Sequence, residues 1–313
     1  MNVGHDTHGA LNEARDNAIL VTHGTSGGRP GYDAHIGPGL ALDSDRHFVV
    51  TVDAIGGGDP SKPPDGPGTD LPGYNIRDMG RAQHHLLTEG LGVTRLAAVG
   101  GPSMGAFQAL EWGVQHPDSV DNLLVIAGAP HADRLFEAVI DTFVGAMQLD
   151  PRRGDGHPDT NATDGLEVAG MVFTPWLYSD GLMTSLQDDG EFDWLLRSMG
   201  RGWAEGRRDV DWMYRYRAAR SHDIAAPFDG DMDAALGAIE ARTLIVHVST
   251  DRPFPERHAR RMDEGIADSV LRVVESDRGH MGCCRSDPSW AEYQRVSAAI
   301  TEFLDGEARV AAD

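Results

Sequence analysis

One stretch, G-P-S-M-G at positions 101–105, constrains the fold of this 313-residue chain more than any other. It matches the pattern G-x-S-x-G, which holds a serine on a sharp turn between a buried strand and a helix. The apolar run at 95–100 precedes it, and a helix-forming run at 106–113 follows it. We therefore interpret Ser103 as a candidate nucleophile. The alternative is a Gly/Ser turn that carries no chemistry.

Short apolar runs recur along the chain and predict buried strands. They lie at 18–23, 47–53, 95–100, 122–127, 243–248 and 270–274. Helices are expected between them at 75–91, 106–113, 255–266 and 288–304, from the spacing of apolar residues or from composition. Alternating strands and helices are typical of an α/β fold with a mostly parallel sheet flanked by helices on both faces.

The alternation stops near Pro130 and resumes after position 229. Between these points the sequence has helical segments and polar loops but no convincing strand. We predict a core in two parts, 1–130 and 230–313, with an inserted helical cap at 131–229. Irregular loops are expected at 55–73 and 150–163, where glycine, proline and aspartate gather.

Two residues that follow predicted strands complete a catalytic group. A serine hydroxyl needs a base within hydrogen-bond reach, and that base needs an acid to orient it. In this kind of sheet the chain order is serine, acid, histidine. Asp251 follows the strand at 243–248, and His280 follows the strand at 270–274. We predict His280 as the base and Asp251 as its partner, with Asp277 and Asp287 as the rival acids.

Two backbone N–H groups are expected to stabilise the negative oxygen that forms during the reaction. Met104 follows the nucleophile directly and supplies one of them. The glycine-rich loop at 23–28 supplies the other, for which we choose Thr25. The alternative is that this loop is only a turn.

Composition narrows the classes of function. The formal net charge of −22 argues against binding to nucleic acid or to anionic membranes. The only cysteines, Cys283 and Cys284, are adjacent, so we expect no disulfide framework and a cytoplasmic protein. No leader peptide or membrane span is expected. No metal or cofactor motif is present, because the histidines lack metal-ligand spacing and no phosphate-loop pattern occurs.

The chain resembles the homoserine O-acetyltransferase branch of the α/β-hydrolase superfamily. The resemblance rests on V-G-G-P-S-M-G-A-F-Q-A-L-E-W at 99–112, N-I-R-D-M at 75–79, S-T-D at 249–251 and G-H at 279–280. It implies an α/β-hydrolase fold with a helical cap, and Ser103, Asp251 and His280 as a triad. It also implies an acyl-enzyme and a homodimer formed through the cap.

Three departures from the acetyltransferase pattern bear on the substrate. Pro102 and Ala106 stand in the family's G-G-S-M-G-G motif. No arginine lies at 136–147, where the acetyltransferases carry one that binds the amino-acid carboxylate. Met281 and the residues up to Cys284 replace the usual Asp-Ala-Phe. These differences favour a hydrolase of a small ester over an acetyltransferase.

Three hypotheses follow. The first is a serine esterase, and the second is an O-acyltransferase that uses acetyl-CoA and an alcohol. The third is a binding protein of the same fold without catalysis. Arginines of the cap could bind a CoA phosphate or a carboxylate, or could form a solvated face paired with acidic residues. They are Arg197, Arg201, Arg207, Arg208, Arg215, Arg217 and Arg220.

Overall fold

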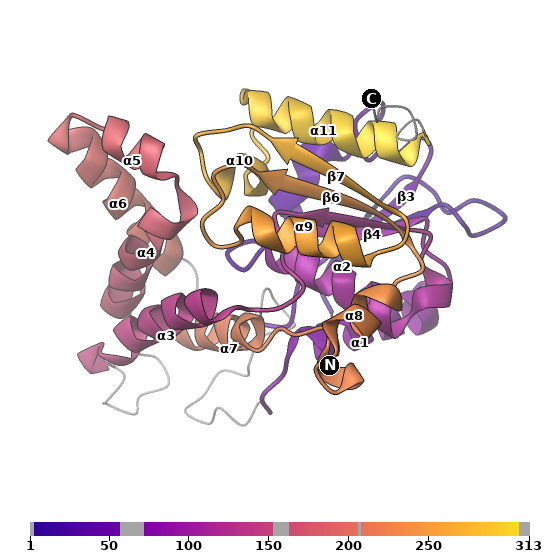
Figure 1. Cartoon of the computed structure of the whole chain (residues 1–313), viewed down its shortest axis with the longest axis horizontal. Helices are drawn as coiled ribbons and strands as arrows, with labels where there is room; N and C mark the ends of the chain where they lie inside the picture. The colour runs from indigo at the N-terminus through magenta and orange to yellow at the C-terminus, as the bar shows by residue number, and fades with distance from the viewer. Residues whose placement is uncertain (1–2, 57–71, 153–162, 206–207, 307–313) are drawn as a thin grey trace.

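The computed structural model describes residues 3–56, 72–152, 163–205 and 208–306 (Figure 1). Its centre is a seven-stranded sheet with the strand order β1-β3-β2-β4-β5-β6-β7. The strands are β1 (His5–His8), β2 (Ala18–Val21), β3 (Phe48–Val52), β4 (Ala98–Pro102), β5 (Asn122–Ile126), β6 (Arg242–Val248) and β7 (Ser269–Val274). Only β1 is antiparallel to its neighbour, β3. The predicted mostly parallel sheet is confirmed.

Helices cover both faces of the sheet because alternate side chains of each strand point to opposite sides. Leu20 of β2 packs in the cluster that contains α2, α8 and α9, whereas Ile19 packs in the cluster that contains α11. The core helices are α1 (Ile76–His85), α2 (Met104–Gln115), α8 (Met232–Gly237), α9 (Glu256–Gly265), α10 (Met281–Cys284) and α11 (Ala291–Leu304). In Figure 1, α11 lies above the sheet and α2 and α9 lie below it.

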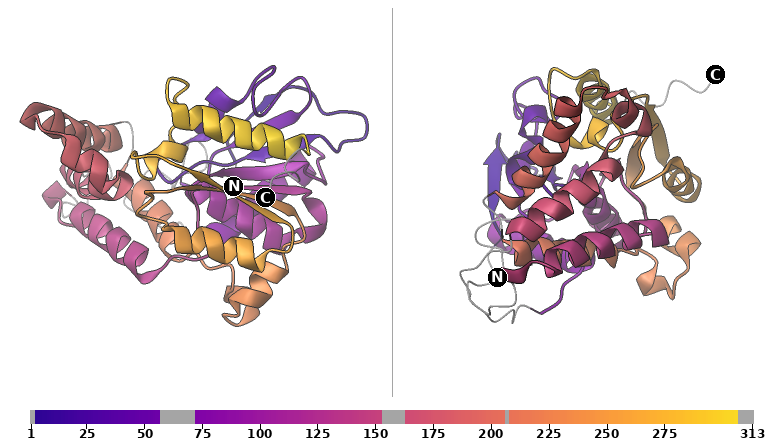
Figure 2. Two further views of the ribbon diagram at one scale, coloured as in Figure 1. Left: turned by 45° about the horizontal axis from the view of Figure 1, so that its top comes forward. Right: turned by 90° about the vertical axis from the view of Figure 1, so that its left-hand side faces the viewer.

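Five further helices form a group beyond the end of the sheet toward which the parallel strands point (Figures 1 and 2). They are α3 (Arg134–Gln148), α4 (Thr163–Leu177), α5 (Asp180–Ser185), α6 (Asp189–Ala204) and α7 (Asp209–Arg220). The described residues between 131 and 229 add no strand to the sheet. Most of the predicted loops at 55–73 and 150–163 lies outside the described residues.

Several element boundaries differ from the sequence-based expectations by one or more residues, and two of the differences lie next to each other in the chain. The predicted helix at 75–91 divides into α1 and a π-helical turn at Leu86–Gly90, where the Leu91 N–H donates to the Leu86 carbonyl. The predicted strand at 95–100 begins later, at Ala98, and runs through Pro102.

Within the described residues, no helix is both long enough and apolar enough to cross a bilayer.

Candidate active site

Ser103 lies on the sharp turn between β4 and α2. Its φ of +58° is in the left-handed region, which is strained for any residue other than glycine. The turn is held because the Ser103 N–H donates to the Ile126 carbonyl of β5 at 2.9 Å. A Cβ at Gly101 would overlap the carbonyl oxygen of Thr22, so the end of β2 packs directly against the turn. The serine is therefore fixed with its side chain above the sheet.

The structure brings the three predicted catalytic side chains together. Nε2 of His280 lies 2.9 Å from Oγ of Ser103, and Nδ1 of His280 lies 2.7 Å from Oδ2 of Asp251. The other Asp251 oxygen, Oδ1, accepts the Phe254 N–H at 2.9 Å. The carboxylate is thereby oriented from two sides. This arrangement can take a proton from the serine and stabilise the resulting imidazolium.

Burial and charge act in opposite directions on the His280 imidazole. Burial lowers the pKa of His280, but the adjacent Asp251 carboxylate and the Cys284 sulfur raise it by more. The net result is a pKa well above 6.5. The direction follows from the geometry, because a buried imidazolium beside a buried carboxylate is a close ion pair in a region of low dielectric constant. The His280 imidazole therefore holds its proton to a higher pH than an exposed histidine does.

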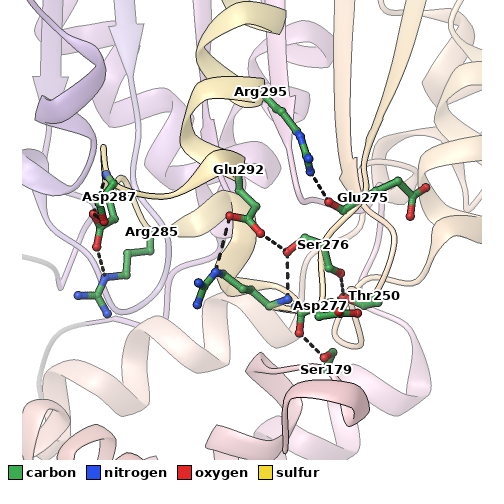
Figure 3. Close-up of polar contacts among 12 residues, drawn as sticks. Ser179, Thr250, Glu275, Ser276, Asp277, Arg285, Asp287, Glu292 and Arg295 are labelled. Atoms are coloured by element: carbon green, nitrogen blue, oxygen red, sulfur yellow. Dashed lines mark hydrogen bonds and ion pairs between the residues drawn. The ribbon is translucent and has the colours of Figure 1, made fainter. Parts of the chain in front are cut away.

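The loop that carries His280 is held by a polar network (Figure 3). The Thr250 hydroxyl donates to the Ser276 carbonyl, and the Ser276 hydroxyl donates to Oε1 of Glu292 at 2.7 Å. From α5's side, the Ser179 hydroxyl donates to the Asp277 carbonyl. The next residue but one, Gly279, has a φ of +61°. Contacts from the core and from the helical group thus fix the backbone that leads into His280.

The rival acids do not reach the base. Asp277 is exposed and contributes its backbone carbonyl rather than its carboxylate to the contacts described above. The Asp287 carboxylate accepts the Ser289 N–H at 3.0 Å and stays in its own turn. Of the three candidate acids, Asp251 alone contacts His280 in the described part of the chain.

A cavity of about 80 Å³ opens above Ser103. Its walls combine the loop at 23–28, the residues Ser103 and His280, and apolar residues of the helical group. The lining residues are His23, Gly24, Thr25, Ser26, Gly27, Gly31, Tyr32, Pro102, Ser103, Phe136, Phe173, Leu177, Tyr216, Pro253, Phe254, His280, Met281 and Cys284. None of these is an arginine, lysine, aspartate or glutamate.

One predicted oxyanion donor lines this cavity, and the other follows Ser103 in the chain. Thr25 is one of its lining residues, and Met104 is the first residue of α2 directly after Ser103. A Cβ at the neighbouring Gly24 would lie 3.4 Å from the Ser103 Cβ, so the loop approaches the nucleophile closely. His23 supports the loop, because its Nε2 accepts the Ala54 N–H at 2.9 Å. The roles of Thr25 and Met104 stay predictions.

Two side chains near the site were not assigned there from the sequence. Sγ of Cys284 lies 3.2 Å from Nε2 of His280, the nitrogen that also faces Ser103. The spacing of four residues was the available signal, because it places both side chains on one face of a helical turn. Arg215 is only 2% exposed and contacts the loop at 23–28, so the solvated-face interpretation is wrong for this arginine.

The aromatic residues of the helical group have different positions. Trp203 and Trp212 are buried and stacked, with ring centroids 4.6 Å apart. Trp194, in contrast, is 66% exposed. In the described part of the chain, no group of three or more histidine, cysteine or acidic residues could hold a metal ion.

Known proteins resemble this chain over nearly its whole length. A family model described as alpha/beta hydrolase fold matches residues 17–286. The homoserine O-acetyltransferase of Thermobifida fusca is 32% identical, covering 96% of this chain and 88% of the relative. The homoserine O-succinyltransferase of Alkalilimnicola ehrlichii is 28% identical, covering 97% and 89%. The solved structure of an acetylester hydrolase from Corynebacterium glutamicum superposes with a TM-score of 0.89 at 26% identity, covering 97% and 90%.

Proposed function

Because this chain belongs to the α/β-hydrolase fold family, we propose that it is a serine esterase that cleaves small, uncharged esters through an acyl-enzyme on Ser103. The observation that carries the substrate class is the cavity wall, which has no arginine, lysine, aspartate or glutamate among its described residues. Homoserine carries an ammonium and a carboxylate group. Leaving either one buried without a partner costs on the order of several kcal/mol.

In the proposed reaction, Oγ of Ser103 attacks the ester carbonyl carbon while its proton passes to Nε2 of His280. The N–H groups of Met104 and Thr25 stabilise the oxyanion of the tetrahedral intermediate. The intermediate collapses, and the leaving alkoxide takes the proton from His280. Water then attacks the acyl-serine and gives a proton to His280, which returns it to Ser103 as the acid departs. Asp251 holds the imidazole in orientation throughout.

We propose that residues 131–229 act as a cap on this reaction and that 1–130 and 230–313 form the core. Support comes from α3, α4 and α7, which contribute Phe136, Phe173, Leu177 and Tyr216 to the cavity wall. An apolar wall of this kind excludes water from most of the site and leaves room for a small acyl group. Dimer formation through the cap and a cytoplasmic location stay predictions.

The second candidate is O-acyl transfer from acyl-CoA to homoserine. It is favoured by the sequence relatives, which are named as homoserine O-acetyltransferases and O-succinyltransferases at 28–32% identity. The first half of that reaction uses the same three side chains. The two candidates differ in the acyl donor, an ester or acyl-CoA, and in whether water or an alcohol resolves the acyl-enzyme.

One pair of assays separates the candidates. Thiol release from acetyl-CoA is measured with and without L-homoserine, and p-nitrophenyl acetate cleavage is measured in parallel. Ser103→Ala serves as the blank, and Ser198→Ala on α6 serves as the matched control. Ester cleavage that needs Ser103, with no homoserine-dependent thiol release, is the expected result. Formation of O-acetylhomoserine would establish the transferase instead, and a protein inactive in both assays would support a binding role.

A further inference from the structure

One arginine of the proposed cap, Arg215, contacts the backbone of the loop at 23–28. Arg215 of α7 donates from Nη1 to the carbonyls of Thr25 and Gly27, the second at 3.2 Å. Its Nη2 donates to the carbonyl of Gly56 at 2.5 Å. Arg217, two residues further along the same helix, is exposed. Arg215 and Arg217 therefore lie on the same helix, but only Arg215 is buried against the loop.

The hydrogen bonds of the buried Arg215 guanidinium hold the loop at 23–28 firmly against α7. A guanidinium taken out of water is stabilised only by hydrogen bonds of good geometry, and charged donors make stronger bonds than neutral ones. Arg215 spreads its bonds over three carbonyls from two separate segments of the core. A shift of the loop would stretch several of these bonds together. The arginine thus ties α7 to the backbone beside the nucleophile.

The loop has little freedom to move without affecting Ser103. Gly24 approaches the nucleophile so closely that an added Cβ would lie 3.4 Å from the Ser103 Cβ. The loop is closed on itself by the Gly27 N–H, which donates to the Gly24 carbonyl at 2.9 Å. Thr25 lies inside this closed turn. Its carbonyl accepts a hydrogen bond from Arg215, and the same residue lines the cavity.

We propose that Arg215 is a positioning residue of the oxyanion hole, through which the cap fixes the Thr25 N–H in the place where the oxyanion forms. The proposal rests on the esterase function proposed above and on Thr25 as a donor. An oxyanion contact strengthens only in the transition state, so loosening it lowers kcat and leaves KM nearly unchanged. Because a misplacement of about 1 Å can cost on the order of 100-fold, we expect a fall in kcat of about 10- to 100-fold.

The test compares Arg215→Met with Arg217→Met in p-nitrophenyl acetate cleavage, with folding checked by circular dichroism and thermal unfolding. Arg215→Met should lose kcat at constant KM, and Arg217→Met should match the unaltered protein. Added guanidinium ion should restore part of the lost kcat. Affinity for a trifluoromethyl ketone, which forms a tetrahedral adduct with the serine, should fall by the same factor as kcat.

Several outcomes would overturn the proposal. These are an unchanged kcat in folded Arg215→Met, a rise in KM alone, or a loss of kcat without weaker binding of the ketone. If Arg215→Met does not fold, Arg215→Lys replaces it, since lysine keeps the charge but not the fork and should still lose kcat. The unaltered protein is assayed first against Ser103→Ala. A lack of Ser103-dependent cleavage there counts against the esterase proposal and not against the contact made by Arg215.

Discussion

Three side chains that follow three different strands lie in contact, with the His280 imidazole between the other two. Ser103 follows β4, Asp251 follows β6 and His280 follows β7, and parallel strands bring these ends to one edge of the sheet. The side chains of His280 and Asp251 are 4% and 0% exposed, so their attraction is little screened by water. At the scale of single residues, the protonation state of His280 should therefore respond strongly to its contact with Asp251.

The pH dependence of the reaction should report that ion pair. Because the pKa of His280 is raised well above 6.5, the neutral base forms only at higher pH. Activity should therefore rise with pH through a midpoint above 6.5 and then level off. In Asp251→Asn the lowering effect of burial remains without the carboxylate, so the midpoint should move to lower pH. We also expect kcat to fall on the order of 10⁴-fold, as in other serine triads.

The measurement is the pH–rate profile of p-nitrophenyl acetate cleavage, corrected with the Ser103→Ala blank. Asp277→Asn is the matched control, because that exposed rival acid should leave the profile unchanged. A midpoint that stays in place in Asp251→Asn would show that another group sets it.

Residues at this scale differ in how far the sequence could predict them. Ser103, Asp251 and His280 were predictable because a motif and two strand ends locate them. The contacts of Arg215 were not predictable from the sequence, since its partners are the backbone carbonyls of Thr25, Gly27 and Gly56. Every residue has a backbone carbonyl, so the sequence does not indicate which ones bind an arginine. Its surroundings in sequence, rich in arginine and aspartate, resemble an exposed helix face.

At the scale of elements, α4 and α6 cross at unusually close range. A Cβ added at Gly170 of α4 would lie 2.9 Å from the Cα of Gly200 of α6. A Cβ added at Gly200 would lie 2.6 Å from the carbonyl oxygen of Glu167. Two backbones pack here without a side chain between them. The crossing lies next to Phe173 and Trp203, which belong to an apolar cluster that also contains residues of α1 and α2.

Two glycines of α6 should respond oppositely to the same change. Gly200→Ala forces a methyl group into the crossing and should lower the free energy of unfolding by about 1–3 kcal/mol. Gly202→Ala places its methyl group where no atom lies within 4 Å, and should raise that free energy by about 0.5–1 kcal/mol. Urea unfolding of both variants tests this. Equal effects of the two changes would mean that the close crossing does not form.

Elements of the core were easier to predict than this crossing. The runs that became β2, β3 and β5 are almost entirely apolar because both faces of the sheet are covered, and a nearly continuous apolar run is a strong signal. The helices α3, α4, α6 and α7 pack against one another, and α3, α4 and α7 also line the cavity, so their contacts depend on partners far away in sequence. Single glycines such as Gly200 give no local sign of whether a neighbouring backbone will approach.

At the scale of the whole molecule, acidic residues outnumber basic ones. The chain has 49 aspartates and glutamates against 27 lysines and arginines, for a formal net charge of −22. Many of the arginines are already used in ion pairs, such as Arg220 with Asp141 at 2.6 Å. The excess acidic groups therefore repel one another across the surface, and compact folding brings them closer together.

Salt should stabilise the folded protein by screening this repulsion. The Debye length falls from about 10 Å at 0.1 M ionic strength to about 3 Å at 1 M. We expect Tm to rise as sodium chloride is raised over this range, measured by differential scanning calorimetry. Sodium sulfate at equal ionic strength separates screening from exclusion of the salt from the protein surface. A Tm that is constant or falls in sodium chloride would mean that repulsion contributes little to stability.

The bonds between Arg215 and the loop at 23–28 also limit how this fold can be recombined. A chimaera that joins the cap of one homologue to the core of another can pair this arginine with a loop whose backbone holds its carbonyls elsewhere, or leave the carbonyls of this loop without an arginine. Such a protein could fold and still be a poor catalyst. If the loop and α7 are exchanged together, Arg215 and its carbonyl acceptors come from the same homologue. Arg215 and Gly27 are brought into contact although they lie 188 positions apart in sequence.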